Sequence, residues 1–195
     1  VLDLTLNPDF SQVESDQPQV TLNERFEVQF PERRPFFVEN ADFFATDSNL
    51  VFTRRIVDPE GGIRLTGKAG DYGFGAIMIN DEAPGLNRDA DDPLDGEKAN
   101  IAILRGFRDF SAQNRVGFLV TDRELGNGYN RVGSLDGRFK LNANWVTQMQ
   151  TVATESEHHA SGEKSTGYQR NIAVNRSGRT FNNHTHYIAT TKDFR

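Results

Sequence analysis

The chain has 195 residues, of which 36% are hydrophobic, and it carries a formal net charge of −6, so it is long enough for one sizeable domain. The acidic balance argues against a nucleic-acid partner, which usually requires a basic face. The lack of cysteine excludes a disulfide framework and thiolate chemistry, and no apolar run approaches the roughly 18 residues of a membrane helix.

The first residues, VLDLTLNPDF, contain neither an initiating methionine nor a basic-then-apolar signal region, so we expect a piece of a longer protein. Residues 1–6 alternate and predict a strand. Thr21 and Glu24 have the spacing of a capping box, which predicts a short helix over about Leu22 to Gln29, before Pro31.

Glycine divides the sequence into two regions. The first sixty residues contain no glycine, but they hold five of the seven prolines and eight of the fifteen phenylalanines. We therefore predict that residues 1–60 form an aromatic and proline-rich segment that packs on or in a sheet. Residues 61–195, which contain all seventeen glycines, are predicted to form a region of antiparallel β-hairpins.

Alternating runs follow one another through the second region. IRLTGKAGDYGFGAIMIN predicts a hairpin that turns around Gly70-Asp71. NIAILRGF and NRVGFLVTD predict two further strands, and ELGNGYN predicts a turn. YQRNIAVNRSGRTFNNHTHYIATT predicts another hairpin, which turns at Ser177-Gly178.

The longest alternating run is GSLDGRFKLNANWVTQM, residues 133–149. Its odd positions are apolar or small, and its even positions are polar with the exception of Val146. Read as one strand, it would extend about 56 Å at roughly 3.3 Å per residue. This is much longer than the usual strand of about five or six residues.

Long hairpins with one apolar and one polar face suit two architectures. One is a large soluble sandwich or curved sheet, in which the apolar face is buried against a second layer. The other is a transmembrane β-barrel, whose apolar residues face lipid and whose polar residues face the lumen. Glycine, alanine and threonine separate the large residues of the apolar face, which favours the barrel slightly, but periodicity leaves both architectures open.

A family resemblance lies in residues 4–44, LTLNPDFSQVESDQPQVTLNERFEVQFPERRPFFVENADFF. They closely resemble the start of a bacterial domain family of unknown function, which commonly follows a carbohydrate-binding module of family 9 in large envelope proteins. The shared pattern is NPDF-x-QVE-x-D, a short helix and FPE-[KR]-RPFF-x-E, and weaker similarity continues to the closing KDFR. One departure is Asn40, where the pattern leads us to expect glycine.

The resemblance implies an outer-membrane-associated β-barrel protein of Gram-negative bacteria, with an upstream carbohydrate-binding module that points to glycans. We therefore predict an all-β fold of long antiparallel hairpins, a partial outer-membrane β-barrel whose Pro/Phe-rich N-terminal segment contains a short helix. The expected partners are outer-membrane lipid and a glycan ligand. The expected location is the outer membrane or the periplasmic side of the cell envelope, and no cofactor or metal is predicted.

The stretch FPERRPFFVEN, residues 30–40, is expected to tuck against or inside the first strands, where its phenylalanines would close an apolar gap. Arginine pairs well with carboxylates in a polar lumen because its planar guanidinium binds them at two points. The alternative is an ordinary strand and turn that caps a soluble sheet. The predicted ion-pair residues are Glu32, Arg33, Arg34, Glu39 and Asp42.

Three aromatic residues of the hairpin region admit two interpretations. Trp145, Tyr168 and Tyr187 would form an aromatic girdle at the membrane interfaces of a barrel, or they would stack on sugar rings. His184 and His186 would share one face of a strand, but the pattern supplies no third metal ligand.

These features predict a non-enzymatic, membrane-embedded or membrane-proximal β-domain of a glycan-associated envelope protein, serving saccharide passage or binding. The first alternative is a soluble periplasmic carbohydrate-active domain that uses carboxylates near Glu32 and Glu39, although neighbouring arginines favour structural ion pairs there. The second is a structural β-domain that only presents its neighbours. A barrel would expose its apolar faces, whereas a soluble enzyme would bury them.

Overall fold

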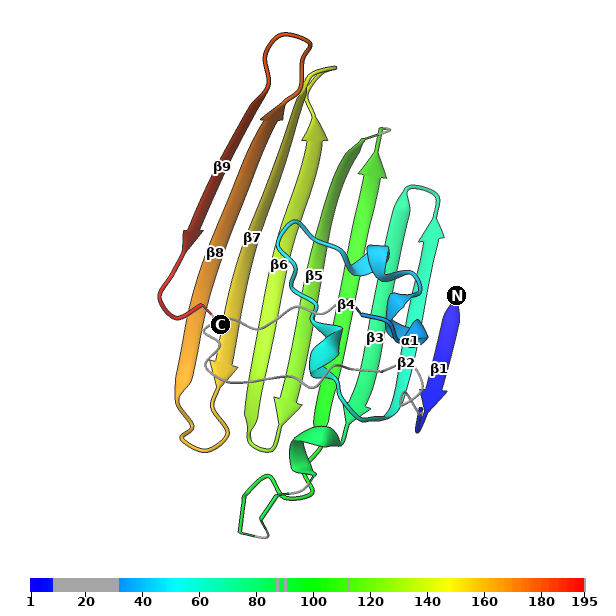
Figure 1. Cartoon of the computed structure of the whole chain (residues 1–195), viewed down its shortest axis with the longest axis vertical. Helices are drawn as coiled ribbons and strands as arrows, with labels where there is room; N and C mark the ends of the chain where they lie inside the picture. Colours follow the sequence, from blue (N-terminus) through cyan, green and yellow to red (C-terminus); the bar gives the residue numbers. More distant parts are fainter. Residues whose placement is uncertain (9–31, 87, 90, 112, 195) are drawn as a thin grey trace.

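The computed structural model describes residues 1–8, 32–86, 88–89, 91–111 and 113–194, and these form a nine-stranded antiparallel sheet. The strands lie side by side in chain order (Figure 1). They are β1 Leu2–Leu6, β2 Pro59–Ala69, β3 Tyr72–Asp81, β4 Ala99–Phe110, β5 Asn114–Leu125, β6 Gly128–Lys140, β7 Trp145–Glu157, β8 Lys164–Arg176 and β9 Asn183–Thr190. The predicted all-β fold of long antiparallel hairpins is confirmed.

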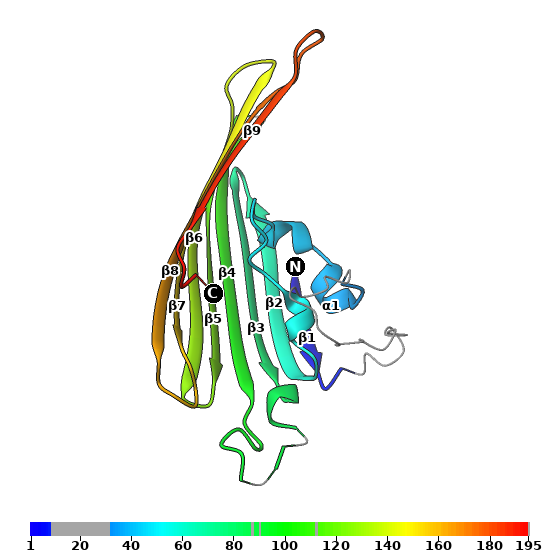
Figure 2. The ribbon, with the colours of Figure 1, turned by 60° about the vertical axis from the view of Figure 1, so that its left-hand side comes forward.

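The sheet is open. Its order runs from β1 to β9, and each of these two edge strands pairs with one neighbour among the described residues. The sheet twists and curves, and residues 32–57 lie against one side of it (Figure 2). We call this side the inner face and the opposite side the outer face. The described strands therefore do not close into a barrel.

The predicted turns at Gly70-Asp71, within ELGNGYN and at Ser177-Gly178 all lie between consecutive strands. The prediction of one strand over residues 133–149 is wrong, because β6 ends at Lys140 and β7 begins at Trp145. The side-chain oxygen of Asn142 accepts hydrogen bonds from the backbone N–H groups of Asn144 (2.9 Å) and Trp145 (3.1 Å), which stabilises the turn.

The alternating pattern did not reveal the turn, because odd-numbered residues lie on the same face of the sheet before and after it. Phe139 pairs with Thr147, and Lys140 pairs with Val146. Directly paired residues of antiparallel strands point to the same face. Odd-numbered residues therefore share the outer face on both strands, and the period of two continues unbroken through the four turn residues.

Residues 32–57, which we call the covering segment, contain short helices and supply four of the nine residues of the main buried hydrophobic cluster. Helix α1 (Pro35–Val38) begins at a proline, whose missing N–H group costs nothing in the first turn. Short 3-10 helices follow at Ala41–Phe44 and Thr53–Arg55, and another, Ala83–Gly85, lies between β3 and β4. The helix predicted over Leu22 to Gln29 falls outside the described residues.

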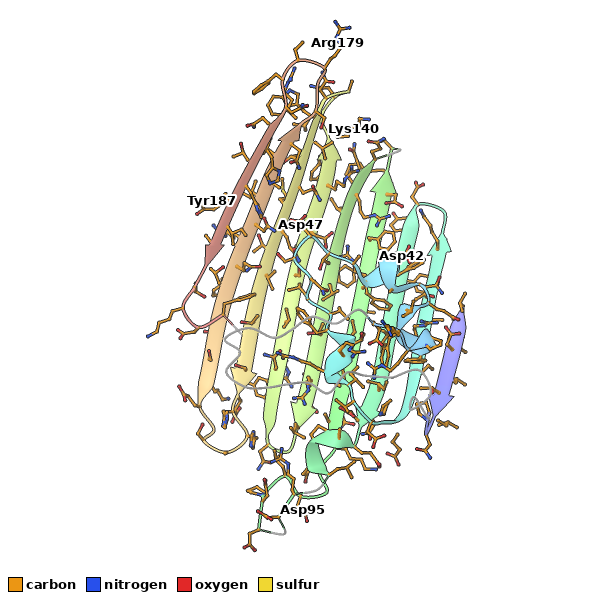
Figure 3. All side chains as sticks on the ribbon, in the orientation of Figure 1. Asp42, Asp47, Asp95, Lys140, Arg179 and Tyr187 are labelled. Atoms are coloured by element: carbon orange, nitrogen blue, oxygen red, sulfur yellow. The ribbon has the colours of Figure 1, made fainter. Side chains whose placement is uncertain are left out.

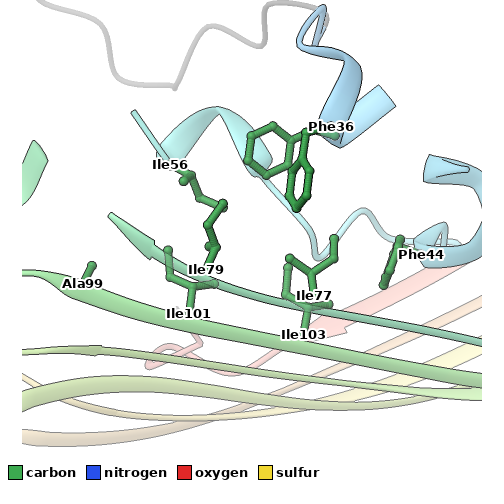
Figure 4. Packing of buried hydrophobic residues seen from close by; sticks show 9 residues of the cluster. Phe36, Phe44, Ile56, Ile77, Ile79, Ala99, Ile101 and Ile103 are labelled. Carbon is green, nitrogen blue, oxygen red and sulfur yellow. The ribbon is translucent and has the colours of Figure 1, made fainter. Parts of the chain in front are cut away.

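Large side chains of this segment pack on isoleucines of β3 and β4 (Figure 4). The buried cluster consists of Phe36, Phe37, Phe44, Ile56, Ile77, Ile79, Ala99, Ile101 and Ile103. Between α1 and the 3-10 helix Ala41–Phe44, Asn40 adopts a left-handed backbone conformation (φ 54°). Glycine and asparagine tolerate this conformation best, which explains why asparagine can replace the expected glycine.

In the described part of the chain, no helix is both long and apolar enough to cross a bilayer. The helices instead belong to the segment on the inner face and to one inter-strand connection.

Candidate functional site

The ends of the covering segment meet at Arg34, which is 2% exposed. Its guanidinium donates to both carboxylate oxygens of Glu32, at 2.9 and 2.7 Å, and to the backbone oxygens of Thr53 (2.9 Å) and Ile56. The Thr53 hydroxyl donates to the same carboxylate at 2.8 Å. This two-point ion pair therefore joins residue 32 to residues 53–56.

The surroundings of Glu32 fix its charge state. Burial alone would raise the pKa of its carboxyl, but hydrogen bonds from Arg34 and Thr53, together with the charge of Arg34, lower the pKa from 4.5 to about 2. A general acid works best when its pKa lies near the working pH. The geometry therefore suits a permanent structural anion better than a proton donor.

A second buried arginine, Arg64 on β2, connects the edge strand to the covering segment. It donates to Asp3 on β1 at 2.7 and 3.0 Å, and to the Glu39 carboxylate at 3.2 Å. It also donates to the backbone oxygens of Phe36 and Glu39. Arg64 therefore joins β1, β2 and the residues around α1.

These contacts show where each predicted ion-pair residue lies. Glu32 and Arg34 come together, whereas Glu39 pairs with Arg64 instead of either predicted arginine. Arg33 and Asp42 are exposed, and neither forms an ion pair with another residue that the structure describes. Asp42 is labelled on the covering segment in Figure 3.

A third buried arginine crosses the inner face itself. Arg105 on β4 is 1% exposed and forms a two-point ion pair with Asp136 on β6. Its guanidinium passes over Gly117 on the strand between them, where an added Cβ atom would lie 2.8 Å from both terminal nitrogens. The absence of a side chain at residue 117 is therefore what lets the two charges meet.

A polar cluster attaches the tip of the covering segment to β7 and β8. The Asp47 carboxylate accepts hydrogen bonds from the side-chain amides of Gln148 (3.0 Å) and Asn171 (2.7 Å). The backbone N–H of Ser48 donates to Gln150, whose amide in turn donates to Ser134 at 2.9 Å. Contacts between residues that are more than a hundred positions apart in the chain therefore hold this tip on the sheet.

The predicted histidines lie beside this polar cluster on the inner face of the edge strand β9. His184 and His186 have ring centroids 5.9 Å apart, and they hydrogen-bond to Asn175 and Asn171. Across the described ranges, no group of three or more histidine, cysteine, aspartate or glutamate side chains is arranged to hold a metal ion. The two rings therefore take part in an amide network.

The outer face carries exposed large apolar side chains on all nine strands. We call this set the outer apolar band; it consists of Leu2, Leu4, Leu6, Ile63, Leu65, Tyr72, Phe74, Met78, Leu104, Val116, Phe118, Val120, Leu135, Met149, Tyr168, Ile172 and Tyr187. Trp145 lies on the same face, so the three predicted aromatic residues share one side of the sheet. Tyr187 is labelled on β9 in Figure 3.

Charged residues limit the outer apolar band at one end of the sheet. Arg131 pairs with Asp122 and Glu124 at 3.3 Å, and Lys164 pairs with Glu157 at 3.3 Å. At the opposite end, Arg108 lies 5.2 Å from the ring centroid of Tyr72. Arg170 is an exposed cation within the outer apolar band. Its long side chain can hold the guanidinium away from the apolar side chains around it.

Several site residues were missed from the sequence, namely Asp3, Asp47, Arg64, Arg105, Asp136, Gln150 and Asn171. Asp47 lies in the covering segment, and the other six are polar residues at inner-face positions of alternating strands, which was their signal in the sequence. Their partners were not visible, because Arg64 and Asp3 lie 61 residues apart and Asn171 and Asp47 lie 124 apart.

Comparison with known proteins identifies a family model at the start of the chain. Residues 1–65 match the model of a domain of unknown function (DUF5916), which confirms the recognition of such a domain in this part of the chain. The matched range contains β1, the covering segment and most of β2, and with them the ion pairs of Arg34 and Arg64. No curated protein and no solved structure matches the chain.

Proposed function

We propose that this chain forms part of the wall of an outer-membrane β-barrel in a Gram-negative envelope, with its outer face against lipid and its inner face toward the lumen. The observation that supports this is the outer apolar band, which extends over every strand. Soluble monomers rarely expose contiguous apolar patches beyond a few hundred Å². In the hydrocarbon core of a bilayer, such an apolar surface is not exposed to water and therefore costs no free energy of hydration.

Strand length supports the same proposal. Strands β2 to β8 contain 10 to 13 residues each. At roughly 3.3 Å per residue and a tilt of about 45°, such strands would rise about 23 to 30 Å. This height matches the apolar zone of a bilayer, and the charged residues at the end of the outer face would lie at its boundary.

Barrel closure requires additional strands against β1 and β9. Unpaired backbone groups at a sheet edge are very costly in hydrocarbon, so both edges must be paired when the sheet is in the membrane. The proposal therefore includes further strands from a longer chain or from another subunit. Residues 32–57 would then lie inside the lumen and partly fill it.

The proposed role is non-enzymatic saccharide passage or binding along the inner face of a glycan-associated envelope protein. Exposed polar side chains on the inner face support this role: Asp47 and His186 both contact Asn171, and His184 lies next to His186. Their carboxylate and imidazole groups are able to hydrogen-bond to sugar hydroxyls.

Site-directed spin labelling tests the membrane part of the proposal, because the chain has no cysteine of its own. Single cysteines at Leu135 and Tyr187 would report on the outer face, and a cysteine at His184 on the inner face. In protein recovered from outer membranes, we expect outer-face labels to collide with dissolved oxygen and to be shielded from a water-soluble nickel complex. The label at residue 184 should show the opposite preference.

Two results would overturn the proposal. One is outer-face labels as accessible to the nickel complex as the label at residue 184. The other is recovery of the full-length protein in the soluble periplasmic fraction, without the heat-dependent gel migration that is typical of barrels. Either would direct attention to a soluble sheet whose apolar face binds another protein layer.

A further inference from the structure

A polar pocket lies at the end of the inner face where β2 turns into β3 and β4 turns into β5. Its volume is about 490 Å³, and its lining includes Lys68, Asp109, Ser111, Gln113, Arg115 and Arg138. Lys140, labelled in Figure 3, marks this end of the sheet. Pockets of about 300 to 1,000 Å³ are of the size that holds small ligands.

The charges of this pocket do not balance. Asp109 accepts hydrogen bonds from Arg115 (2.6 Å) and Lys68 (2.7 Å). Hydrogen bonds from Arg115, which outweigh burial, and then from Lys68 lower the pKa of Asp109 from 3.8 to about 2. One carboxylate therefore faces three lining cations, which leaves two positive charges. The neighbouring Asp71 is exposed in the β2–β3 turn and does not line the pocket.

Arg138 supplies a cation with unused hydrogen-bond donors. Its side chain is exposed, and one terminal nitrogen donates to the backbone oxygen of Gln113 at 3.0 Å. Within the described ranges no carboxylate forms an ion pair with it. A guanidinium has five N–H donors in a planar arrangement that matches carboxylate and phosphate oxygens.

We propose that this pocket binds an oxyanion, that is, the carboxylate, phosphate or sulfate group of a small ligand. Arg138 would bind two oxygens of the anion, while Lys68 and Arg115 would supply the remaining positive potential. The Ser111 hydroxyl and the Gln113 amide would donate hydrogen bonds to neighbouring polar groups. The site depends on the inner face alone, so it does not rest on the proposed membrane location.

Binding of three probes to the purified protein tests this proposal. Inorganic phosphate and glucuronate carry an oxyanion, whereas glucose does not. We expect saturable binding of one or both anions by calorimetry, weaker binding at higher salt, and no saturable binding of glucose. Binding of phosphate alone would identify a phosphate site, and binding of glucuronate alone a sugar-acid site.

Two variants, each of which removes one positive charge, distinguish anion binding in the pocket from a general effect of net charge. Arg138→Gln should weaken anion binding about tenfold, because it removes charge-assisted hydrogen bonds but leaves the Asp109 contacts intact. Arg108→Gln is the control, since Arg108 precedes Asp109 but is exposed on the outer face. It should retain wild-type affinity.

The absence of saturable binding for both anions would overturn the proposal, as would glucose binding as tightly as glucuronate. Equal weakening in the two variants would also overturn it, because the effect would then come from net charge. Circular dichroism of both variants should match the parent protein, so that loss of folding is distinguished from loss of the site.

Discussion

Arg34, Arg64 and Arg105 are three buried charged residues that join segments on the inner face. Each is at most 2% exposed, and each forms an ion pair with a carboxylate. A buried ion pair adds little net stability over a well-packed apolar pair, but losing one partner leaves an uncompensated buried charge. The three arginines therefore specify which segments meet, and their partners should be sensitive to substitution.

The Arg105–Asp136 pair gives the first prediction. Gly117→Ala should lower the free energy of unfolding by about 1 kcal/mol, because the new methyl group would lie 2.8 Å from both terminal nitrogens of Arg105 and would displace the guanidinium from Asp136. Urea titration of the purified protein measures this. The control is Gly133→Ala on β6, where an added Cβ atom meets nothing within 4 Å. Equal stability of the two variants would contradict the role of Gly117.

The pKa of Glu32 gives the second prediction. Because this pKa is depressed from 4.5 to about 2, the carboxylate stabilises the folded state above pH 4.5, and that stabilisation disappears as the pH falls toward 2. The loss should amount to about 3 kcal/mol. Unfolding measured between pH 5 and 2 should depend less on pH in Glu32→Gln. The same pH dependence in both proteins would show that the ion pair is unimportant.

At the scale of elements, the covering segment is attached to the sheet in two different ways. Near α1 it buries phenylalanines on β3 and β4, whereas its tip is held by hydrogen bonds to β7 and β8. Hydrogen bonds without apolar burial contribute only about 1 kcal/mol each. The tip should therefore separate from the sheet more readily than the region around α1.

The third prediction concerns this tip. Asp47→Ala removes the acceptor of two hydrogen bonds and should increase hydrogen exchange in residues 45–50, while the strands and α1 keep their protection. Asp42→Ala is the control, because Asp42 belongs to the same segment and forms no ion pair among the described residues. Unchanged exchange in Asp47→Ala would show that other contacts hold the tip.

At the scale of the whole molecule, the two faces of the curved sheet differ in how much apolar surface they expose, and this difference allows membrane insertion to be tested. The inner face is covered in part by residues 32–57, and the outer face exposes apolar side chains throughout. In water an exposed position tolerates a charge at little cost, usually within about 0.5 kcal/mol. In a bilayer the same charge near the midplane costs about 2 to 4 kcal/mol.

The fourth prediction uses this difference. Leu104→Lys, on the outer face of β4, should lower stability in lipid vesicles by about 2 to 4 kcal/mol and reduce recovery in outer membranes. Asn100→Lys is the control, since residue 100 lies on the same face and strand but pairs with Glu124 at the polar end. Its cost should be about 0 to 1 kcal/mol. Equal behaviour of both variants would contradict insertion of this face.

Much of the sheet was predictable because its signals are local. Alternation placed side chains on two faces, and glycine with asparagine or aspartate marked turns such as Gly70-Asp71. The motif around Glu32 and Arg34 was recognised, and these residues pair because they are only two apart. The turn at residues 141–144 was missed because it preserves the alternating phase, so periodicity alone contains no sign of it.

The amino-acid sequence by itself determined the class of fold, the two-sided character of the strands and the family resemblance of the first residues, because propensity and alternation act between near neighbours. The tertiary structure decided which carboxylate each arginine meets, which face is covered and where the cationic pocket forms. Asp3 and Arg64, like Asp109 and Lys68, become partners through strand pairing. Such pairing depends on the register of segments that are far apart in the chain, and short-range patterns do not encode that register.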